Sequence, residues 1–120
     1  MGKPVVHFEI TGTDTKSLSE FYTNLFDWKV DIMPMEQTTY GMVDTGQEGK
    51  ITGGLAGSDD PNAHGVVIYI EVDDPQAYLD KAESLGGKTI IPVQVIPDMV
   101  TFAQFVDPQG NRIGLVKNAA

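Results

Sequence analysis

The chain has 120 residues, of which 41% are hydrophobic, and it contains no cysteine. This length and composition are typical of one domain with one core, and the lack of cysteine excludes a disulfide framework and a thiolate zinc site. The formal net charge is −9. Because a field of that sign repels phosphate backbones and anionic lipid, we expect neither nucleic acid nor a membrane surface as a partner.

The first half of the chain predicts a strand, a helix and three further strands. Alternation indicates a half-buried first strand with one face formed by Val6, Phe8 and Ile10. His7 and Glu9 lie on its other face. Asp14 is a helix cap, and one apolar stripe follows at helical spacing, namely Leu18, Phe21, Tyr22 and Leu25. Short strands are predicted over residues 28–32, 38–43 and 51–55, with glycine and proline between them.

The middle of the chain, residues 57–65, is polar and rich in glycine, aspartate and proline, so it predicts a linker. A second alternating strand follows over residues 66–72. Asp74 and Pro75 form a strong helix start, and Gly86 with Gly87 ends that helix. Further strands are predicted over residues 89–91, with an extension to residue 95, and over residues 100–106 and 113–116. Residues 107–110 predict a type I turn.

The two halves repeat each other at an offset of 60 residues, which aligns Asp14 with Asp74 and Gly54 with Gly114. Such self-similarity is the mark of a duplicated unit. We therefore predict a single domain over residues 1–120, with one module over residues 4–56, a linker over 57–65 and a second module over 66–117. Each module has the order βαβββ.

One helix per module covers only one face of its four strands. We assign the helices to the face that carries the alternating apolar residues. The opposite face carries a mixed polar and aromatic set, namely His7, Glu9, Val67, Tyr69 and Glu71. This composition favours the wall of a ligand cavity, and the alternative is an ordinary solvated sheet face.

Several segments carry a resemblance to a known family. They are residues 7–10 (HFEI), 21–28 (FYTNLFDW), 69–74 (YIEVDD), 85–88 (LGGK) and 107–111 (DPQGN). In order and spacing the chain resembles the glyoxalase/bleomycin-resistance (vicinal oxygen chelate) superfamily, which includes extradiol dioxygenases. It is most similar to the branch described as predicted enzymes related to lactoylglutathione lyase. The resemblance implies an α+β fold whose curved mixed sheet has helices on its convex side and a ligand cleft on its concave side.

The resemblance also locates the metal ligands of the metal-dependent members. In those members, the first and fourth strands of both modules supply four ligands. The matching positions here are His7, Gly54, Val67 and Gly114, so only His7 retains a ligand side chain. One imidazole without a carboxylate holds a divalent metal weakly. We predict no cofactor, and the alternative is an atypical metal site created by a shifted strand register.

The candidate ligand-binding residues are His7, Glu9, Tyr40, Tyr69, Glu71 and Gln104. His7, Glu9 and Glu71 are also candidates for proton transfer, since a histidine titrates near neutral pH and an unpaired carboxylate is costly to bury. Tyr40 and Tyr69 are suited to stacking on a flat ligand. The remaining acidic candidates, Asp44, Glu48 and Asp107, are interpreted as turn residues, and His64 falls in the linker.

Three functional hypotheses remain open. The first is a cytoplasmic protein of the bleomycin-resistance kind that binds a small organic molecule without a metal. The second is a glyoxalase-like lyase or isomerase, or a dioxygenase, that uses His7 and carboxylates with an atypical metal site. In either case the resemblance implies a homodimer. A third hypothesis, a structural partner without a ligand, rests only on the small size and acidity of the chain.

Overall fold

The computed structural model describes residues 2–34, 39–46 and 51–118. The chain divides into two compact units, one made of Met1–Val6 with Val67–Ala120 and the other of His7–Val66. Among the described residues, each unit contains one α-helix and four strands, which confirms the predicted α+β fold with two βαβββ modules. We call residues 5–57 module one and residues 65–118 module two.

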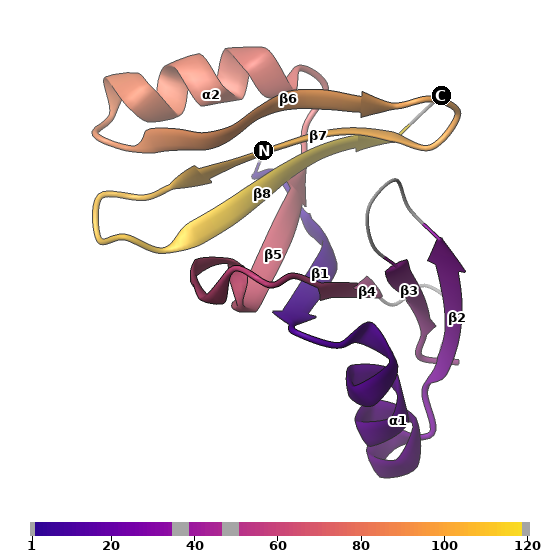
Figure 1. The fold of residues 1–120 in the computed structure, drawn as a ribbon. Coiled ribbons are helices and arrows are strands. Elements are labelled where there is room, and N and C mark those ends of the chain that lie inside the picture. Colours follow the sequence, from indigo (N-terminus) through magenta and orange to yellow (C-terminus); the bar gives the residue numbers. More distant parts are fainter. Residues whose placement is uncertain (1, 35–38, 47–50, 119–120) are drawn as a thin grey trace. The chain divides into compact units, whose positions relative to one another are not determined.

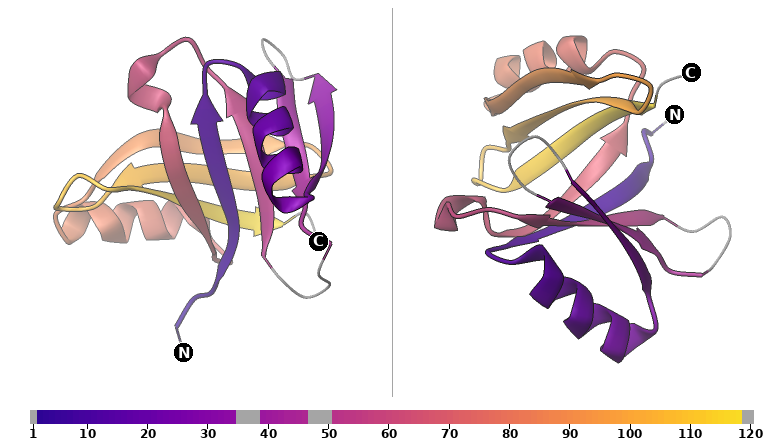
Figure 2. Two further views of the ribbon diagram at one scale, coloured as in Figure 1. Left: turned by 90° about the horizontal axis from the view of Figure 1, so that it is seen from below. Right: turned by 45° about the vertical axis from the view of Figure 1, so that its right-hand side comes forward.

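Module one runs from the first strand to the fourth. Its elements are β1 (Val5–Gly12), α1 (Thr15–Phe26), β2 (Lys29–Pro34), β3 (Thr39–Asp44) and β4 (Thr52–Gly57), labelled in Figure 1. The strands lie in the order β2-β3-β4-β1. β1 is parallel to β4, and the other neighbours are antiparallel. Figure 2 shows α1 lying against one face of this sheet, so the other face is left to polar side chains.

Module two repeats this arrangement after a short 3-10 helix over Pro61–Ala63. Its elements are β5 (Gly65–Glu71), α2 (Pro75–Ser84), β6 (Lys88–Ile96), β7 (Val100–Val106) and β8 (Arg112–Asn118). The strand order is β5-β8-β7-β6, again with a parallel pair, β5 and β8, and antiparallel neighbours. Neither helix of the described residues is long and apolar enough to cross a bilayer.

The predicted helix ends and turn are confirmed. The Asp14 carboxylate accepts hydrogen bonds from the first turn of α1, and the Asp74 carboxylate accepts one from the Ala77 amide over 3.1 Å. Gly86 has a φ of +99°, which suits glycine at a helix end. In the type I turn, the Gly110 amide donates to the Asp107 carbonyl over 2.9 Å.

Strand bounds differ from the predictions by a few residues at their ends. The second strand begins at Lys29 rather than Trp28, because Asp27 adopts a left-handed conformation with a φ of 61° that first ends α1. β4 begins one residue later than predicted and ends at Gly57. Thr38, the predicted start of the third strand, lies outside the described residues.

The helix side of module one is an aromatic cluster. Phe8 on β1 packs against Trp28 with ring centroids 5.5 Å apart, and Tyr22 on α1 stacks on the same indole at 5.3 Å. The predicted apolar stripe of α1 is only half correct. Phe21 and Leu25 are 59% and 56% exposed, since they flank the line of contact with the sheet instead of pointing at it.

Module two has packed side chains on both faces of its sheet. On the helix side, Val72, Leu79, Ala103 and Leu115 form a buried cluster. On the other side, Val67, Tyr69 and Val116 form a second cluster, so this part of the sheet is not an open polar surface. Val6 of β1 also packs against the second cluster.

Candidate functional site

A chain of hydrogen bonds links four side chains on module one. β1 and β4 place His7 opposite Thr52 and Glu9 opposite Gly54. The two nitrogens of His7 bond in opposite directions, with Nδ1 at 2.6 Å from the Thr52 hydroxyl and Nε2 at 3.1 Å from the Tyr40 hydroxyl. Tyr40 in turn donates to Glu9 Oε2 over 3.1 Å. Three of the predicted site residues therefore meet, and we call this set of four the module-one network.

The direction of each bond follows from counting donors. A tyrosine has one hydroxyl proton, and Tyr40 gives it to Glu9. The bond between His7 and Tyr40 therefore uses a proton on His7 Nε2. In a neutral imidazole the other nitrogen is then an acceptor, so the Thr52 hydroxyl donates to Nδ1. All three hydrogen bonds therefore donate in the same direction along the network, from Thr52 to His7, from His7 to Tyr40 and from Tyr40 to Glu9.

Burial lowers the pKa of His7 below its ordinary value of 6.5, because desolvation disfavours the charged imidazolium. Below pH 6.5 the unfolded chain then takes up a proton that the folded chain resists. We expect the network to stabilise the fold fully above pH 6.5 and to lose this contribution as the pH falls toward the lowered pKa.

The measurement is a comparison of unfolding free energy between wild type and His7→Gln across pH 5 to 8. The difference between the two proteins isolates His7 from the carboxylates that titrate lower. An NMR titration of the His7 ring checks the same point directly. A midpoint at or above 6.5 contradicts this prediction.

Tyr40 occupies the space that a side chain at position 54 would need. A Cβ built on Gly54 would overlap the Tyr40 hydroxyl, whereas a Cβ on the preceding Gly53 would overlap the Phe8 ring. Neighbouring strand residues point to opposite faces, and Phe8 lies on the helix side. The module-one network therefore lies on the face opposite α1.

A second network occupies the corresponding face of module two. Gly114 on β8 pairs with Tyr69 on β5 and with Gln104 on β7. The side chains of Tyr69 and Gln104 are buried, at 5% and 4% exposure. The Gln104 amide donates a hydrogen bond to the Tyr69 hydroxyl over 2.6 Å. Arg112 donates to Gln104 Oε1 over 3.3 Å. A Cβ on Gly114 would overlap the Tyr69 ring, so a tyrosine again covers the glycine.

Glu71 lies apart from the contacts of Tyr69 and Gln104. It is the last residue of β5, and its carboxylate accepts a hydrogen bond from Asn118 over 3.1 Å. The other acidic candidates have turn roles, as predicted. Asp44 accepts from the Gly46 amide and Asp107 from the Asn111 amide, while Glu48 lies outside the described residues. His64 stays within the linker, bonded to the Ser58 carbonyl at 2.8 Å.

The residues present do not fit the metal that the family resemblance implies. Three of the four corresponding positions are Gly54, Val67 and Gly114, and tyrosine rings fill the space in front of both glycines. Within the described residues, no group of three or more His, Cys, Asp or Glu side chains is placed to hold a metal ion. Both His7 nitrogens are bonded to hydroxyl groups instead.

Sequence reasoning missed two members of these networks, Thr52 and Arg112. They are separated by the same 60-residue offset that aligns the modules. Each starts the last strand of its module, two residues before the covered glycine. The repeat was therefore a usable signal for the pair, although nothing in either residue type pointed to a site.

Comparison with known proteins gives a consistent family relationship. The family model of the Glyoxalase/Bleomycin resistance protein/Dioxygenase superfamily matches residues 5–115. The chain is 29% identical over 113 residues to the protein named "Putative glyoxylase CFP32" in Mycobacterium bovis and Mycobacterium tuberculosis. That match covers 89% of this chain but 42% of the relative. The chain thus spans less than half the length of these curated relatives.

Solved structures share the fold at low sequence identity. A hypothetical protein, BH1468 from Bacillus halodurans, has a TM-score of 0.76 at 14% identity, covering 100% of this chain and 97% of that one. A variant of Streptomyces coelicolor methylmalonyl-CoA epimerase, in complex with 2-nitronate-propionyl-CoA, has a TM-score of 0.74 at 19% identity. The match covers 98% of this chain and 96% of the epimerase chain. These similarities establish the architecture.

Proposed function

Since this chain belongs to the Glyoxalase/Bleomycin resistance protein/Dioxygenase superfamily, we propose that it binds a small organic molecule on the sheet face opposite α1, without a standing metal site. The observation that carries this proposal is the module-one network. Its polar side chains lie where the family resemblance implies a ligand cleft, and Thr52 at its start is exposed. Ligand capture by hydrogen bonding replaces capture by metal coordination.

The direction of the network narrows the class of ligand. Thr52, His7 and Tyr40 each give their proton to the next member. Both nitrogens of His7 are already used, so any further hydrogen bond is one that the Thr52 or the Tyr40 hydroxyl oxygen accepts. A matching ligand must supply the donors, as a phenol, an amide N–H or an amine does. The net charge of −9 further favours a neutral or cationic molecule over an anion.

A second candidate function is acid–base catalysis, and the position of Tyr40 between His7 and Glu9 favours it. If Glu9 takes a proton from a bound substrate, the electron pair stays on the substrate, and a hydrogen bond from Tyr40 stabilises the carboxylate before the transfer. The curated relatives are named as glyoxylases, which agrees with such chemistry. Stoichiometric metal in the purified protein would instead favour the atypical metal-site enzyme.

The test uses phenols and aryl amines, each paired with its O- or N-methylated analogue that lacks the donor. We expect those phenols and aryl amines that bind to raise the melting temperature of the protein, and we expect their methylated analogues to leave it unchanged. Tyr40→Phe keeps the ring over Gly54 but removes two hydrogen bonds. It should weaken binding several-fold, because the ligand loses the Tyr40 hydroxyl as an acceptor and one neutral hydrogen bond contributes about 0.5–1.5 kcal/mol.

Tyr22→Phe is the matched control, because it removes a hydroxyl from a half-buried tyrosine on the helix side. Its affinity should equal that of wild type. Equal affinity in Tyr40→Phe, or equal binding of donors and methylated analogues, would refute the role of the network. Turnover that disappears in Glu9→Gln while binding persists would select the catalytic candidate.

We further propose a cytoplasmic homodimer. Closed two-fold pairing of identical copies is the commonest form of oligomer. Light scattering coupled to size exclusion measures the mass, and a monomer at micromolar concentration would refute this part.

A further inference from the structure

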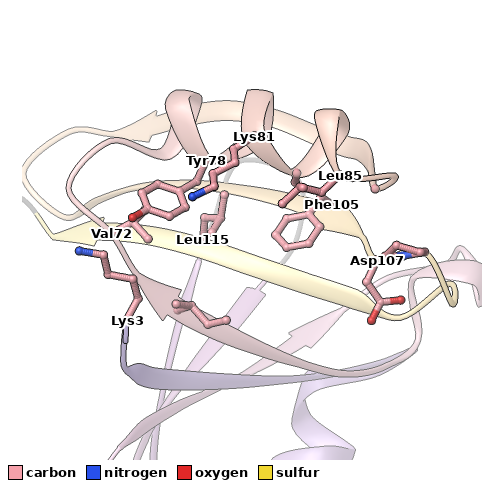
Figure 3. Close-up of a pocket in the computed structure, with 12 residues that line it drawn as sticks. Lys3, Val72, Tyr78, Lys81, Leu85, Phe105, Asp107 and Leu115 are labelled. Atoms are coloured by element: carbon pink, nitrogen blue, oxygen red, sulfur yellow. The ribbon is translucent and has the colours of Figure 1, made fainter. Parts of the chain in front are cut away.

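A pocket lies between α2 and the sheet of module two, and Lys3 of the N-terminal segment, which belongs to the same compact unit, also lines it. Its volume is about 450 Å³. Figure 3 shows Val72, Leu115 and Phe105 on the sheet side and Leu85 on the helix side. Ile70 and Val72 alternate with Tyr69 and Glu71 along β5, so the pocket and the Tyr69 network lie on opposite faces of this sheet. The pocket is therefore separate from the proposed ligand face.

The charges around this pocket are segregated. In Figure 3 the amino groups of Lys3 and Lys81 lie at the end where the Tyr78 hydroxyl lies, and the Asp107 carboxylate lies at the other end. The chain has only 8 lysine and arginine residues against 17 acidic ones. Two cations at one end of an apolar pocket therefore make a local exception to the acidic surface.

The position of Lys3 is fixed by the backbone beside it. The Glu71 amide donates to the Pro4 carbonyl over 2.9 Å, which attaches the N-terminal segment to the end of β5. Leu85 directly follows α2 at its C-terminal end, and its side chain is 70% exposed. A large apolar side chain at a pocket rim gains burial when a ligand with an apolar body fills the pocket.

We propose that this pocket binds a medium-chain monocarboxylate. The alkyl chain lies along Val72, Leu115 and Phe105, and the carboxylate lies at the Lys3 and Lys81 end, where amino groups pair with it. A volume near the lower end of the usual range for ligand pockets fits a ligand of roughly ten non-hydrogen atoms. Asp107 at the far end disfavours a second carboxylate, so a dicarboxylate of the same length is excluded.

Octanoate is the probe, with octylammonium as the partner of equal chain length and opposite charge. Titration calorimetry at about 0.15 M salt, where long-range repulsion by the acidic surface is screened, should give one saturable octanoate site. Octylammonium should bind at least tenfold more weakly. Amide chemical-shift changes on octanoate addition should concentrate on α2, β5 and β8.

Two variants test whether the lysine end of the pocket binds the carboxylate and whether the apolar rim binds the alkyl chain. Lys3→Met with Lys81→Met should weaken octanoate binding at least tenfold, while Lys16→Met with Lys29→Met, which makes the same charge change on module one, should leave it unchanged. Leu85→Ser removes apolar rim from an exposed position and should weaken binding several-fold. All four of these lysines and Leu85 are exposed, so each variant should fold.

The proposal fails if octanoate shows no saturable binding, if octylammonium binds equally well, or if the Lys3 and Lys81 double variant matches the Lys16 and Lys29 control. It also fails if the chemical-shift changes lie on module one. None of these outcomes depends on the module-one network, so the two sites are tested separately.

Discussion

Gly54→Glu is expected to destabilise the protein by about 3 kcal/mol or more instead of creating a metal site. The substitution places a carboxylate at the family's ligand position. However, its Cβ would overlap the Tyr40 hydroxyl, and forcing atoms into a packed site costs about 1–3 kcal/mol. Displacing Tyr40 also breaks its bond to the Glu9 carboxylate, which adds about 1.5–3 kcal/mol for a bond to a charged group, and its bond to the neutral His7 ring. Chemical denaturation measures the loss.

The controls separate crowding from charge. Gly54→Ala adds only the Cβ and should still cost about 1–3 kcal/mol, whereas Gly2→Ala, with no atom within 4 Å of its Cβ, should cost nothing measurable. Tyr40→Ala should relieve the crowding, so the Tyr40→Ala and Gly54→Ala double variant should be more stable than the sum of the single effects predicts. A Gly54→Ala protein as stable as wild type would show that Tyr40 does not occupy this space.

Tyr69→Phe should destabilise module two by about 1–3 kcal/mol, because it leaves the buried Gln104 amide without its acceptor. Tyr69→Ala should cost more, about 3–5 kcal/mol, since it also removes a buried ring and leaves a cavity over Gly114. Urea denaturation of the three proteins gives both values. The order of stability should be wild type, then Tyr69→Phe, then Tyr69→Ala.

A second change at the partner tests the reason for this loss. Replacing both members of a buried hydrogen bond by apolar groups is less costly than replacing one. Tyr69→Phe combined with Gln104→Leu should therefore recover part of the stability that Tyr69→Phe loses. If Tyr69→Phe is as stable as wild type, the hydroxyl of Tyr69 has no structural role, and Gln104 becomes available as a ligand-binding residue.

Local signals in the sequence were sufficient for the elements of this fold. Asp14 and Asp74 cap the helices as predicted, because a cap depends on residues two or three positions away. Alternation correctly placed His7 and Glu9 on one face of β1, since side-chain direction in a strand depends only on the period of two. The repeat extended both results to the second module and supported the family assignment.

Which side chains meet across the sheet was decided by pairing between segments that are distant in the sequence. Thr52 joins His7 only because β1 and β4 are parallel neighbours with that register, and the two residues are 45 positions apart. Tyr40 and Tyr69 reach corresponding glycines from different strands, β3 in one module and β5 in the other. Sequence periodicity gives the face of a side chain but not its neighbours across the sheet. The sequence by itself therefore determined the two modules and the residue types at the four positions that the resemblance marks, whereas the tertiary structure decided which hydroxyl and amide groups lie around those positions.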